Sequence, residues 1–158
     1  MKKKIIIGCM MALCFITCSA CTLPFEFPLG NTTDEVSVSF QEQVKIAAVE
    51  EKSEDVLAIR VTDAEKDKKL IEVMQALRTD EQLTFTQDSQ GMVIAINGKE
   101  NAADWSGCWM LYTSDEEFSS IEWGVYEYHG AALGSAVFGA DALPVVNGEI
   151  YVWVYTKF

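Results

Sequence analysis

The sequence predicts an α+β domain in which one helix packs on one face of a mixed β-sheet. A single stretch, residues 70–77, carries apolar side chains at the spacing of one helix face. Several short runs are instead rich in β-branched and aromatic residues, which is typical of strands. These runs are residues 56–61, 83–87, 92–96, 108–113, 121–128 and 149–157.

The first 20 residues resemble a cleavable export signal. Three consecutive lysines, residues 2–4, precede an apolar run from Ile5 to Thr17, which is shorter than the roughly 20 residues of a membrane-spanning helix. The following Cys18-Ser19-Ala20-Cys21 resembles a bacterial lipobox, in which small residues precede a cysteine that receives a diacylglycerol, although an aliphatic residue is usual where Cys18 stands. We therefore expect residues 1–20 to be removed and Cys21 to anchor the chain to the membrane. The alternative is an ordinary secretory signal that is cut after Ala20.

Residues 21–53 are predicted to form a tether between the lipid and the domain. Prolines and a glycine follow Cys21 without any helical or alternating period. A short strand is predicted over 36–40, where apolar residues alternate with serines, although 41–52 could equally be helical. The domain itself is assigned to residues 54–158.

A strand followed by an amphipathic helix opens the predicted domain. Residues 56–61 read Val-Leu-Ala-Ile-Arg-Val, as expected for a buried strand. Thr62 and Glu65 have the spacing of a capping box, which predicts a helix that starts beside Thr62. Apolar residues then follow at i, i+3, i+4 and i+7 and form one stripe of a helix of roughly three turns. They are Leu70, Val73, Met74 and Leu77.

The second half of the domain is predicted to consist mainly of strands. Residues 83–87 and 92–96 form two of them, and the second ends in the turn Asn97-Gly98, before a polar loop over 99–106. Residues 108–113 and 121–128 are aromatic strands, joined by a turn that contains Asp115, Glu116 and Glu117, whose carboxylates are expected to be solvated. Residues 130–142, rich in glycine and alanine, are expected to form a close-packed loop or a short helix. Residues 149–157 form the closing strand.

The charge of the chain excludes several classes of partner. The formal net charge is −12 at pH 7, and removal of residues 1–20 leaves 9 basic against 24 acidic residues. Nucleic acid and anionic membrane surfaces repel such a protein. We therefore expect no nucleic-acid partner, and contact with the membrane only through the N-terminal lipid.

Nothing in the sequence predicts catalysis. Phosphate-binding loops, nucleophile elbows, zinc-binding helices, Cys-x-x-Cys pairs and calcium loops are all missing from it. Once Cys21 is lipidated, Cys108 is the only remaining thiol, and it lies in an apolar strand, where a buried thiol is usually inert. His129 is the only imidazole, too few for a structural zinc site. We expect no catalytic residue, no resident metal and no required cofactor; without a lipid on Cys21, a disulfide to Cys108 would be available.

Aromatic residues concentrate between Trp105 and Phe158, a stretch that holds all four tryptophans and all five tyrosines. Alternate residues of a strand face opposite sides, so Trp123 is expected on one face with Ile121 and Val125, and Tyr126 with Tyr128 on the other. Surface tryptophan and tyrosine supply rigid amphipathic contact area for a flat ligand or a protein partner, and filling of the core is the alternative. His129 is expected in a loop, where it could also serve as an axial ligand to a metal held in an organic ring. The candidate ligand surface is Trp105, Trp109, Tyr112, Trp123, Tyr126, Tyr128 and His129.

The order of strand, helix and returning strands is that of a β-grasp domain. Five stretches, taken in order, are residues 70–77, Gly91 to Gly98, Cys108 to Tyr112, Gly134-Ser135 and Asn147 to Tyr155. Together they resemble the transcobalamin-like C-terminal domain of bacterial surface lipoproteins, a domain of unknown function. The resemblance covers roughly residues 54–158. The large helical domain that completes the cobalamin cage in the carriers has no counterpart here, and the segment 113–130 is longer and more acidic than in many relatives.

That resemblance implies a β-grasp fold similar to the domain that closes over cobalamin in transcobalamin and intrinsic factor. It also implies no enzymatic activity, and a ligand-facing place for Trp109 and Tyr112.

Together these features predict a lipid-anchored, extracytoplasmic, non-catalytic binding module whose ligand surface is the Trp105–Tyr128 region. A cobalamin-type corrinoid or another flat organic ligand is one version of this hypothesis. The alternative is a structural or interaction domain of the cell surface that recognises a protein or glycan and has no small-molecule pocket. A pocket walled by aromatic planes would favour the first version, and a flat exposed aromatic patch would favour the second.

Overall fold

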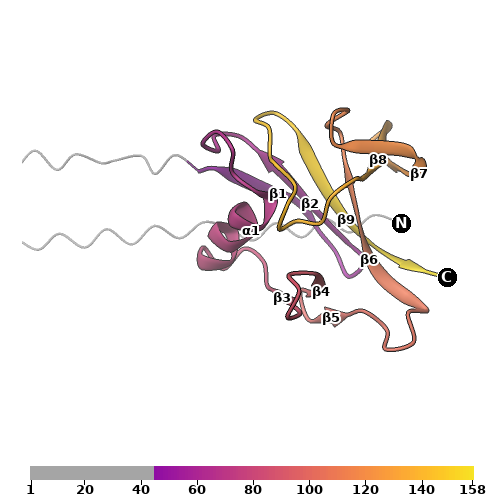
Figure 1. Cartoon of the computed structure of the whole chain (residues 1–158). Coiled ribbons are helices and arrows are strands. Elements are labelled where there is room, and N and C mark those ends of the chain that lie inside the picture. Colours follow the sequence, from indigo (N-terminus) through magenta and orange to yellow (C-terminus); the bar gives the residue numbers. More distant parts are fainter. Residues whose placement is uncertain (1–44) are drawn as a thin grey trace, which may run out of the picture. The chain divides into compact units, whose positions relative to one another are not determined.

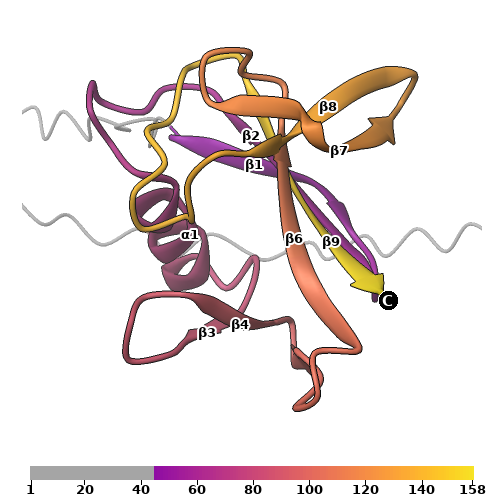
Figure 2. The same ribbon diagram turned by 45° about the vertical axis from the view of Figure 1, so that its right-hand side comes forward.

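The structure of the chain, a computed structural model, describes residues 45–158, which fold into one helix and nine strands (Figures 1 and 2). The predicted export signal (1–20), the predicted lipidation site Cys21, most of the predicted tether and the predicted strand over 36–40 lie outside the described residues. In chain order the elements are β1 (Ala47–Lys52), β2 (Val56–Val61), α1 (Leu70–Thr79), β3 (Phe85–Gln87), β4 (Val93–Ile96), β5 (Lys99–Glu100), β6 (Gly107–Thr113), β7 (Ser119–Tyr128), β8 (Ala131–Ala136) and β9 (Ile150–Lys157).

Two sheets organise these strands. The larger has the order β1-β2-β9-β6-β8-β7, and the smaller has the order β3-β4-β5. The predicted α+β class with a single helix is confirmed for the described residues. The large sheet was expected to be mixed. Each of its strand pairings is instead antiparallel, and β9 runs between β2 and β6 in the direction opposite to both.

The main hydrophobic core lies between α1 and one face of the large sheet. The predicted apolar stripe of α1 is buried, and it packs against alternate residues of β2, β9 and β6. The helix on one face of the sheet is therefore confirmed. The sheet residues that share this core are Leu57, Ile59, Val61, Trp109, Leu111, Tyr151 and Trp153.

The opposite face of the sheet is covered by the β7–β8 hairpin. Figure 2 shows this hairpin and α1 on opposite sides of β9. Its side chains form a second, smaller core with β2 and β9, since residues that alternate with those of the main core point to this side. The members of this second core are Ala58, Tyr128, Leu133, Ile150 and Val152, with Tyr112 and Tyr126 packed against them.

The helix begins later than the capping-box pattern predicted. Thr62 does not cap it: its hydroxyl donates to the carbonyl of Lys45 (2.7 Å), and α1 starts only at Leu70. Glu72 instead accepts the backbone N–H of Lys69 (2.8 Å), which satisfies one of the free amides at the start of the helix. Residues 62–69 form a connection because Thr62 is already bound to the strand region before β1.

Two segments that the sequence left open are strands. Ala47–Lys52, for which a helix was an alternative, forms a hairpin with β2, so the sheet includes residues before the predicted boundary at 54. Ala131–Ala136 was expected to be a loop or short helix and is instead β8, between β6 and β7. Its small residues are needed there, because a Cβ on Gly134 would lie 2.9 Å from the Cβ of Ser119.

The remaining strand and turn predictions agree with the structure, with two further differences. Asn97 (φ 49°) and Gly98 (φ 84°) form the expected turn after β4, but the polar loop that follows contains the short strand β5. In the acidic turn, Glu116 and Glu117 are exposed as expected, whereas Asp115 is buried. Its Oδ1 accepts the N–H of Glu117 (2.9 Å), which draws the carboxylate inward.

Candidate functional site

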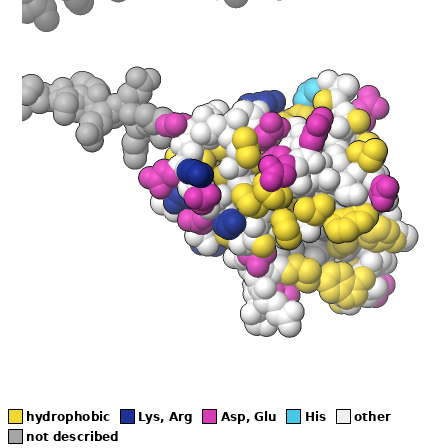
Figure 3. All heavy atoms as spheres, turned by 45° about the horizontal axis from the view of Figure 1, so that its top comes forward, with side chains coloured by type: hydrophobic (Ala, Val, Ile, Leu, Met, Phe, Trp, Pro, Cys, Tyr) yellow, Lys and Arg dark blue, Asp and Glu magenta, His cyan; other side chains and the backbone are white. Residues whose placement is uncertain are grey.

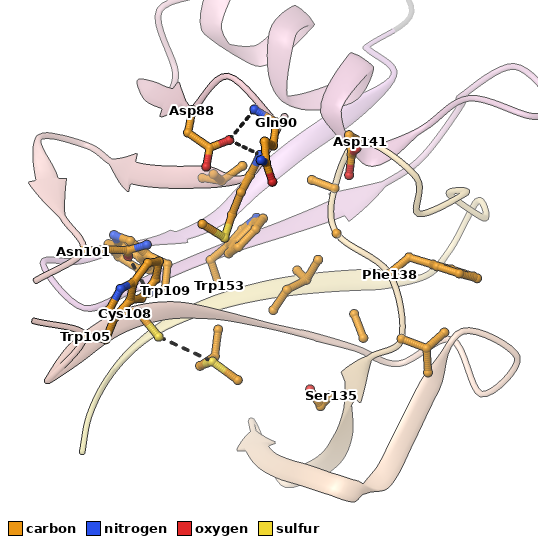
Figure 4. Close-up of a pocket in the computed structure, with 18 residues that line it drawn as sticks. Asp88, Gln90, Asn101, Trp105, Cys108, Trp109, Ser135, Phe138, Asp141 and Trp153 are labelled. Carbon is orange, nitrogen blue, oxygen red and sulfur yellow. Dashed lines mark hydrogen bonds between the residues drawn. The ribbon is translucent and has the colours of Figure 1, made fainter. Parts of the chain in front are cut away.

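A pocket of about 490 Å³ opens between three segments of the domain (Figure 4). One wall is β6, the second is the connection between β3 and β4, and the third is the connection that follows β8. Trp153 of β9 and Trp105, in the loop before β6, complete the lining. We call this the tryptophan pocket; its large apolar side chains are Met92, Trp105, Trp109, Met110, Phe138 and Trp153.

Trp109 is fixed in the wall of this pocket by two hydrogen bonds. Its backbone N–H donates to Oδ1 of Asn101 (2.9 Å), and its indole N–H donates to the carbonyl of Lys99 (2.8 Å). The ring also meets Tyr155 edge to face, with 5.5 Å between ring centroids. Only 6% of Trp109 is exposed, so it is both a core residue and a rigid part of the pocket.

Trp105 is the exposed counterpart of Trp109. It is 56% exposed and has a φ of 61°, an uncommon conformation for a side chain of this size. The neighbouring turn holds it there, because Asp104 accepts hydrogen bonds from the hydroxyl (2.7 Å) and the N–H (3.1 Å) of Ser106. The same bonds lower the pKa of the Asp104 carboxyl.

Trp153 brings an unsatisfied hydrogen-bond donor to the pocket. Its side chain is 95% buried and lines the pocket from β9, directly across the strand pair from Leu111. The indole N–H has no hydrogen-bond partner in the structure. A buried donor without a partner costs about 1–3 kcal/mol.

The charged residues of the pocket are both acidic. Oδ1 of Asp88 accepts the backbone N–H groups of Gln90 (2.8 Å) and Met92 (3.0 Å), which shapes the turn between β3 and β4. Asp141 lies against this turn, since a Cβ on Gly91 would be 3.2 Å from its Oδ2. No lysine, arginine or histidine is among the described residues that line the pocket.

Cys108 is the one thiol of the pocket. Its Sγ lies 3.7 Å from Sδ of Met110, as drawn in Figure 4. Burial raises the pKa of the Cys108 thiol, so little thiolate is present at neutral pH. His129 belongs to a different part of the surface and does not line the pocket.

The predicted ligand surface is divided between four places. Trp105 and Trp109 line the tryptophan pocket. Tyr112 and Tyr126 contact each other, with 5.6 Å between ring centroids, and pack on the opposite face of the sheet. Trp123 is 65% exposed on β7, and Ile121 and Val125, which were expected on the same face, are also exposed.

Tyr128 and His129 lie at a second hollow, of about 430 Å³, together with Glu50 and Arg60. His129 (φ 48°) and Gly130 form the two-residue turn between β7 and β8, so the expected loop position of His129 is confirmed. The ring of His129 contacts that of Tyr128, with 4.3 Å between centroids. This hollow is separate from the three tryptophans of the pocket.

Sequence reasoning missed Trp153, Phe138 and Met92 as pocket residues. A hint for Trp153 was its alternation with Tyr151 and Tyr155, which puts all three on one face of β9. The pairing of β9 with β6, which brings that face beside Trp109, was not visible in the sequence. Met92 and Phe138 lie in connections far apart in the chain and carry no signal of their convergence.

Comparison of the chain with protein-family models, with curated protein sequences and with solved structures finds no match. Within residues 45–158, no helix is long and apolar enough to span a membrane. No group of three or more His, Cys, Asp or Glu side chains in the same range is placed to hold a metal ion. The geometry and chemistry of the tryptophan pocket are therefore the main indication of function.

Proposed function

We propose that the domain is a non-catalytic binding module that takes an organic ligand in the tryptophan pocket, and that a lipid on Cys21 holds it outside the cytoplasmic membrane. The proposal rests on one pocket that Trp105, just before β6, and Trp109 of β6 share with Trp153 of β9. Its volume of about 490 Å³ is within the range of organic-ligand sites, about 300–1,000 Å³. Aromatic and methionine side chains supply broad, adaptable apolar contact.

The chemistry of the pocket lining favours binding over catalysis. Cys108 and Ser135 are its candidate nucleophiles, and no histidine or lysine among the described lining residues stands beside either of them as a base. The raised pKa of Cys108 keeps its thiol protonated at neutral pH. Asp88 is engaged in a turn through the hydrogen bonds to Gln90 and Met92.

In this proposal the domain is a β-grasp module related to the transcobalamin-like family, and a flat corrinoid is the first ligand to test. The succession of a β-hairpin, one helix and returning strands supports the fold assignment, whereas the antiparallel pairing of β2 with β9 departs from the mixed sheet expected of it. Trp109 lines the pocket, in line with the ligand-facing place that the resemblance implies, whereas Tyr112 packs on the other face of the sheet. An axial role for His129 is not part of the proposal, because His129 lies at the second hollow.

A second candidate function is recognition of a protein or glycan by the exposed face of β7. Ile121 (72% exposed), Trp123 (65%) and Val125 (53%) belong to β7, the edge strand of the large sheet, where its pairing with β8 is interrupted between Ser120 and Val125. Exposed apolar groups on a sheet edge favour macromolecular contact. Figure 3 shows hydrophobic side chains gathered on part of one face of the protein, with acidic side chains around them.

The four tryptophan indole N–H groups distinguish the two candidates in one NMR experiment. We would titrate ¹⁵N-labelled chain from residue 21 onward, carrying Cys21→Ser, with cobinamide and with lumichrome as a second flat probe. The pocket proposal expects saturable shifts of the Trp105, Trp109 and Trp153 indole resonances and an unchanged Trp123 resonance. Assignment uses single Trp→Phe variants.

Two exposed tryptophans provide matched variants for this titration. Trp105→Ala removes a pocket residue, and Trp123→Ala removes a residue of β7 with similar exposure. We expect the first to weaken binding of a flat probe about tenfold and the second to leave it unchanged, since loss of one large aromatic contact costs on the order of 1–2 kcal/mol. Pocket indoles that respond to no flat probe, and to none of the peptides described below, would overturn the proposed function.

A further inference from the structure

One edge of β6 is open beside the tryptophan pocket. The N–H of Trp109 donates to Asn101, and the carbonyl of Gly107 accepts the N–H of Ala102 (2.8 Å), so odd-numbered residues of β6 turn their backbone groups away from β9. β8 pairs with this edge only at Tyr112 and Thr113. The carbonyl of Trp109 and the amide of Leu111 therefore face the pocket edge without a strand partner.

The charged residues of the pocket favour a positively charged ligand. Asp88 and Asp141 line the same pocket from the two connections that form its other walls, and the described lining holds no basic residue. The whole chain carries a formal charge of −12. A cationic ligand is attracted by this field at long range, and an anionic ligand is repelled.

The two free backbone groups of β6 match the backbone of a peptide. The carbonyl of Trp109 is an acceptor and the amide of Leu111 is a donor, and each peptide residue carries one donor and one acceptor. Large apolar side chains lie beside these groups, among them Trp109 itself and Trp153, which is 95% buried and lines the pocket. The open edge therefore suits an extended peptide with an apolar side chain.

We infer that the open edge of β6 binds an extended peptide with basic side chains, which pairs with Trp109 and Leu111 as a short added strand. Strand addition of this kind draws affinity from backbone hydrogen bonds and specificity from alternate side chains. An apolar side chain of the peptide enters the tryptophan pocket, and a neighbouring lysine or arginine reaches Asp88 and Asp141. This inference rests on the proposed function, because it names the class of ligand for the same pocket.

Three synthetic peptides test this inference. The first is acetyl-Thr-Val-Lys-Val-Lys-Thr-amide, the second replaces both lysines with glutamate, and the third keeps the lysines but is N-methylated at the four central residues. N-methylation removes the backbone donors and leaves charge and side chains in place. We expect the first peptide to bind at least about tenfold more tightly than either of the others, which corresponds to 1.4 kcal/mol.

Hydrogen exchange reports the added strand directly. When the lysine peptide binds, the amide of Leu111 should exchange more slowly, because it gains a hydrogen-bond partner. The indole resonance of Trp153 should shift, because Trp153 lines the pocket. Asp141→Asn should weaken binding of this peptide about threefold. Glu122→Gln changes the net charge equally on exposed β7, away from the pocket, and should have no such effect.

The outcomes separate this inference from the proposed function. Equal binding of the lysine and glutamate peptides, equal binding of the N-methylated peptide, or an unchanged Leu111 amide would each overturn the inference. If cobinamide or lumichrome shifts the pocket indoles while no peptide does, the pocket binds organic ligands and the peptide inference fails alone. If neither kind of probe shifts them, both proposals fail.

Discussion

The buried hydroxyl of Tyr151 limits the pH range in which the domain is stable. Tyr151 is fully buried in β9, and its hydroxyl oxygen accepts the backbone N–H of Val146 (2.9 Å). Burial raises the pKa of Tyr151 to about 12, since the phenolate would lose its hydration. The residue thus links the connection before β9 to the core, and its burial favours the neutral phenol over the phenolate.

Stability should fall in alkaline solution through Tyr151. The folded pKa lies above the unfolded value of about 10, so the contribution is complete below pH 10 and is lost as pH rises from 10 towards 12, on the order of 2–3 kcal/mol in all. Tyr151→Phe should lose about 1 kcal/mol at pH 8, because the Val146 amide loses its acceptor, and should show a shallower alkaline decline. Urea denaturation of both proteins at pH 8 to 11.5 measures this. Parallel declines would contradict the assignment.

At the scale of elements, the β7–β8 hairpin depends on close approach of two strands. Gly134 of β8 leaves no room for a side chain, since an added Cβ would lie 2.9 Å from Cβ of Ser119 and 3.2 Å from the carbonyl carbon of Ser120. The hairpin in turn covers the second core through Leu133 and Tyr128. The absence of a side chain at Gly134 therefore allows the hairpin to cover the second core.

Gly134→Ala should destabilise the domain by about 1–3 kcal/mol, the usual cost of overpacking a tight contact. Ala132→Val is the matched control, because Ala132 is exposed on the same strand, and its effect should remain within about 0.5 kcal/mol. Thermal unfolding of the two variants and the parent chain gives the comparison. A stable Gly134→Ala protein would mean that β7 shifts easily relative to β8.

Elements with a strong local pattern could be predicted from the sequence. The apolar stripe of α1, the β-branched run of β2 and the turn at Asn97-Gly98 specify their own structure, because side-chain period and backbone conformation are local properties. β8 could not be predicted, since its alanines and glycine have weak strand propensity and it forms where tight packing demands small residues.

The pocket was predictable only in part, for a related reason. Trp105 and Trp109 could be selected from the sequence, the first in a polar loop and the second in a strand. Which other residues line a pocket with them depends on the register between strands. Leu111 faces Trp153 only because β6 and β9 pair at that register. The sequence pattern determines which face a side chain takes within a strand, and the tertiary fold determines which strands share that face.

At the scale of the whole molecule, the proposed function joins an acidic binding domain to a membrane by its N-terminus. The chain from residue 21 onward carries 9 basic against 24 acidic residues and is repelled by anionic lipid surfaces, so the proposed attachment depends on the lipid rather than on the protein surface. A ligand of positive charge, as inferred for the open edge of β6, is concentrated by the same field. Charge therefore favours one class of ligand and disfavours direct membrane contact.

Lipidation at Cys21 should decide where the chain resides. Expressed in a bacterium and labelled with radioactive palmitate, the wild-type chain should carry the label and partition into the detergent phase of Triton X-114, because two acyl chains on one residue give stable anchoring. Cys21→Ser should abolish both properties. Cys18→Ser should keep both, since Cys18 is lost with the export signal. Loss of the label in Cys18→Ser but not in Cys21→Ser would show that Cys18 carries the lipid. An unlabelled wild-type chain would indicate an ordinary secretory signal instead of a lipoprotein signal.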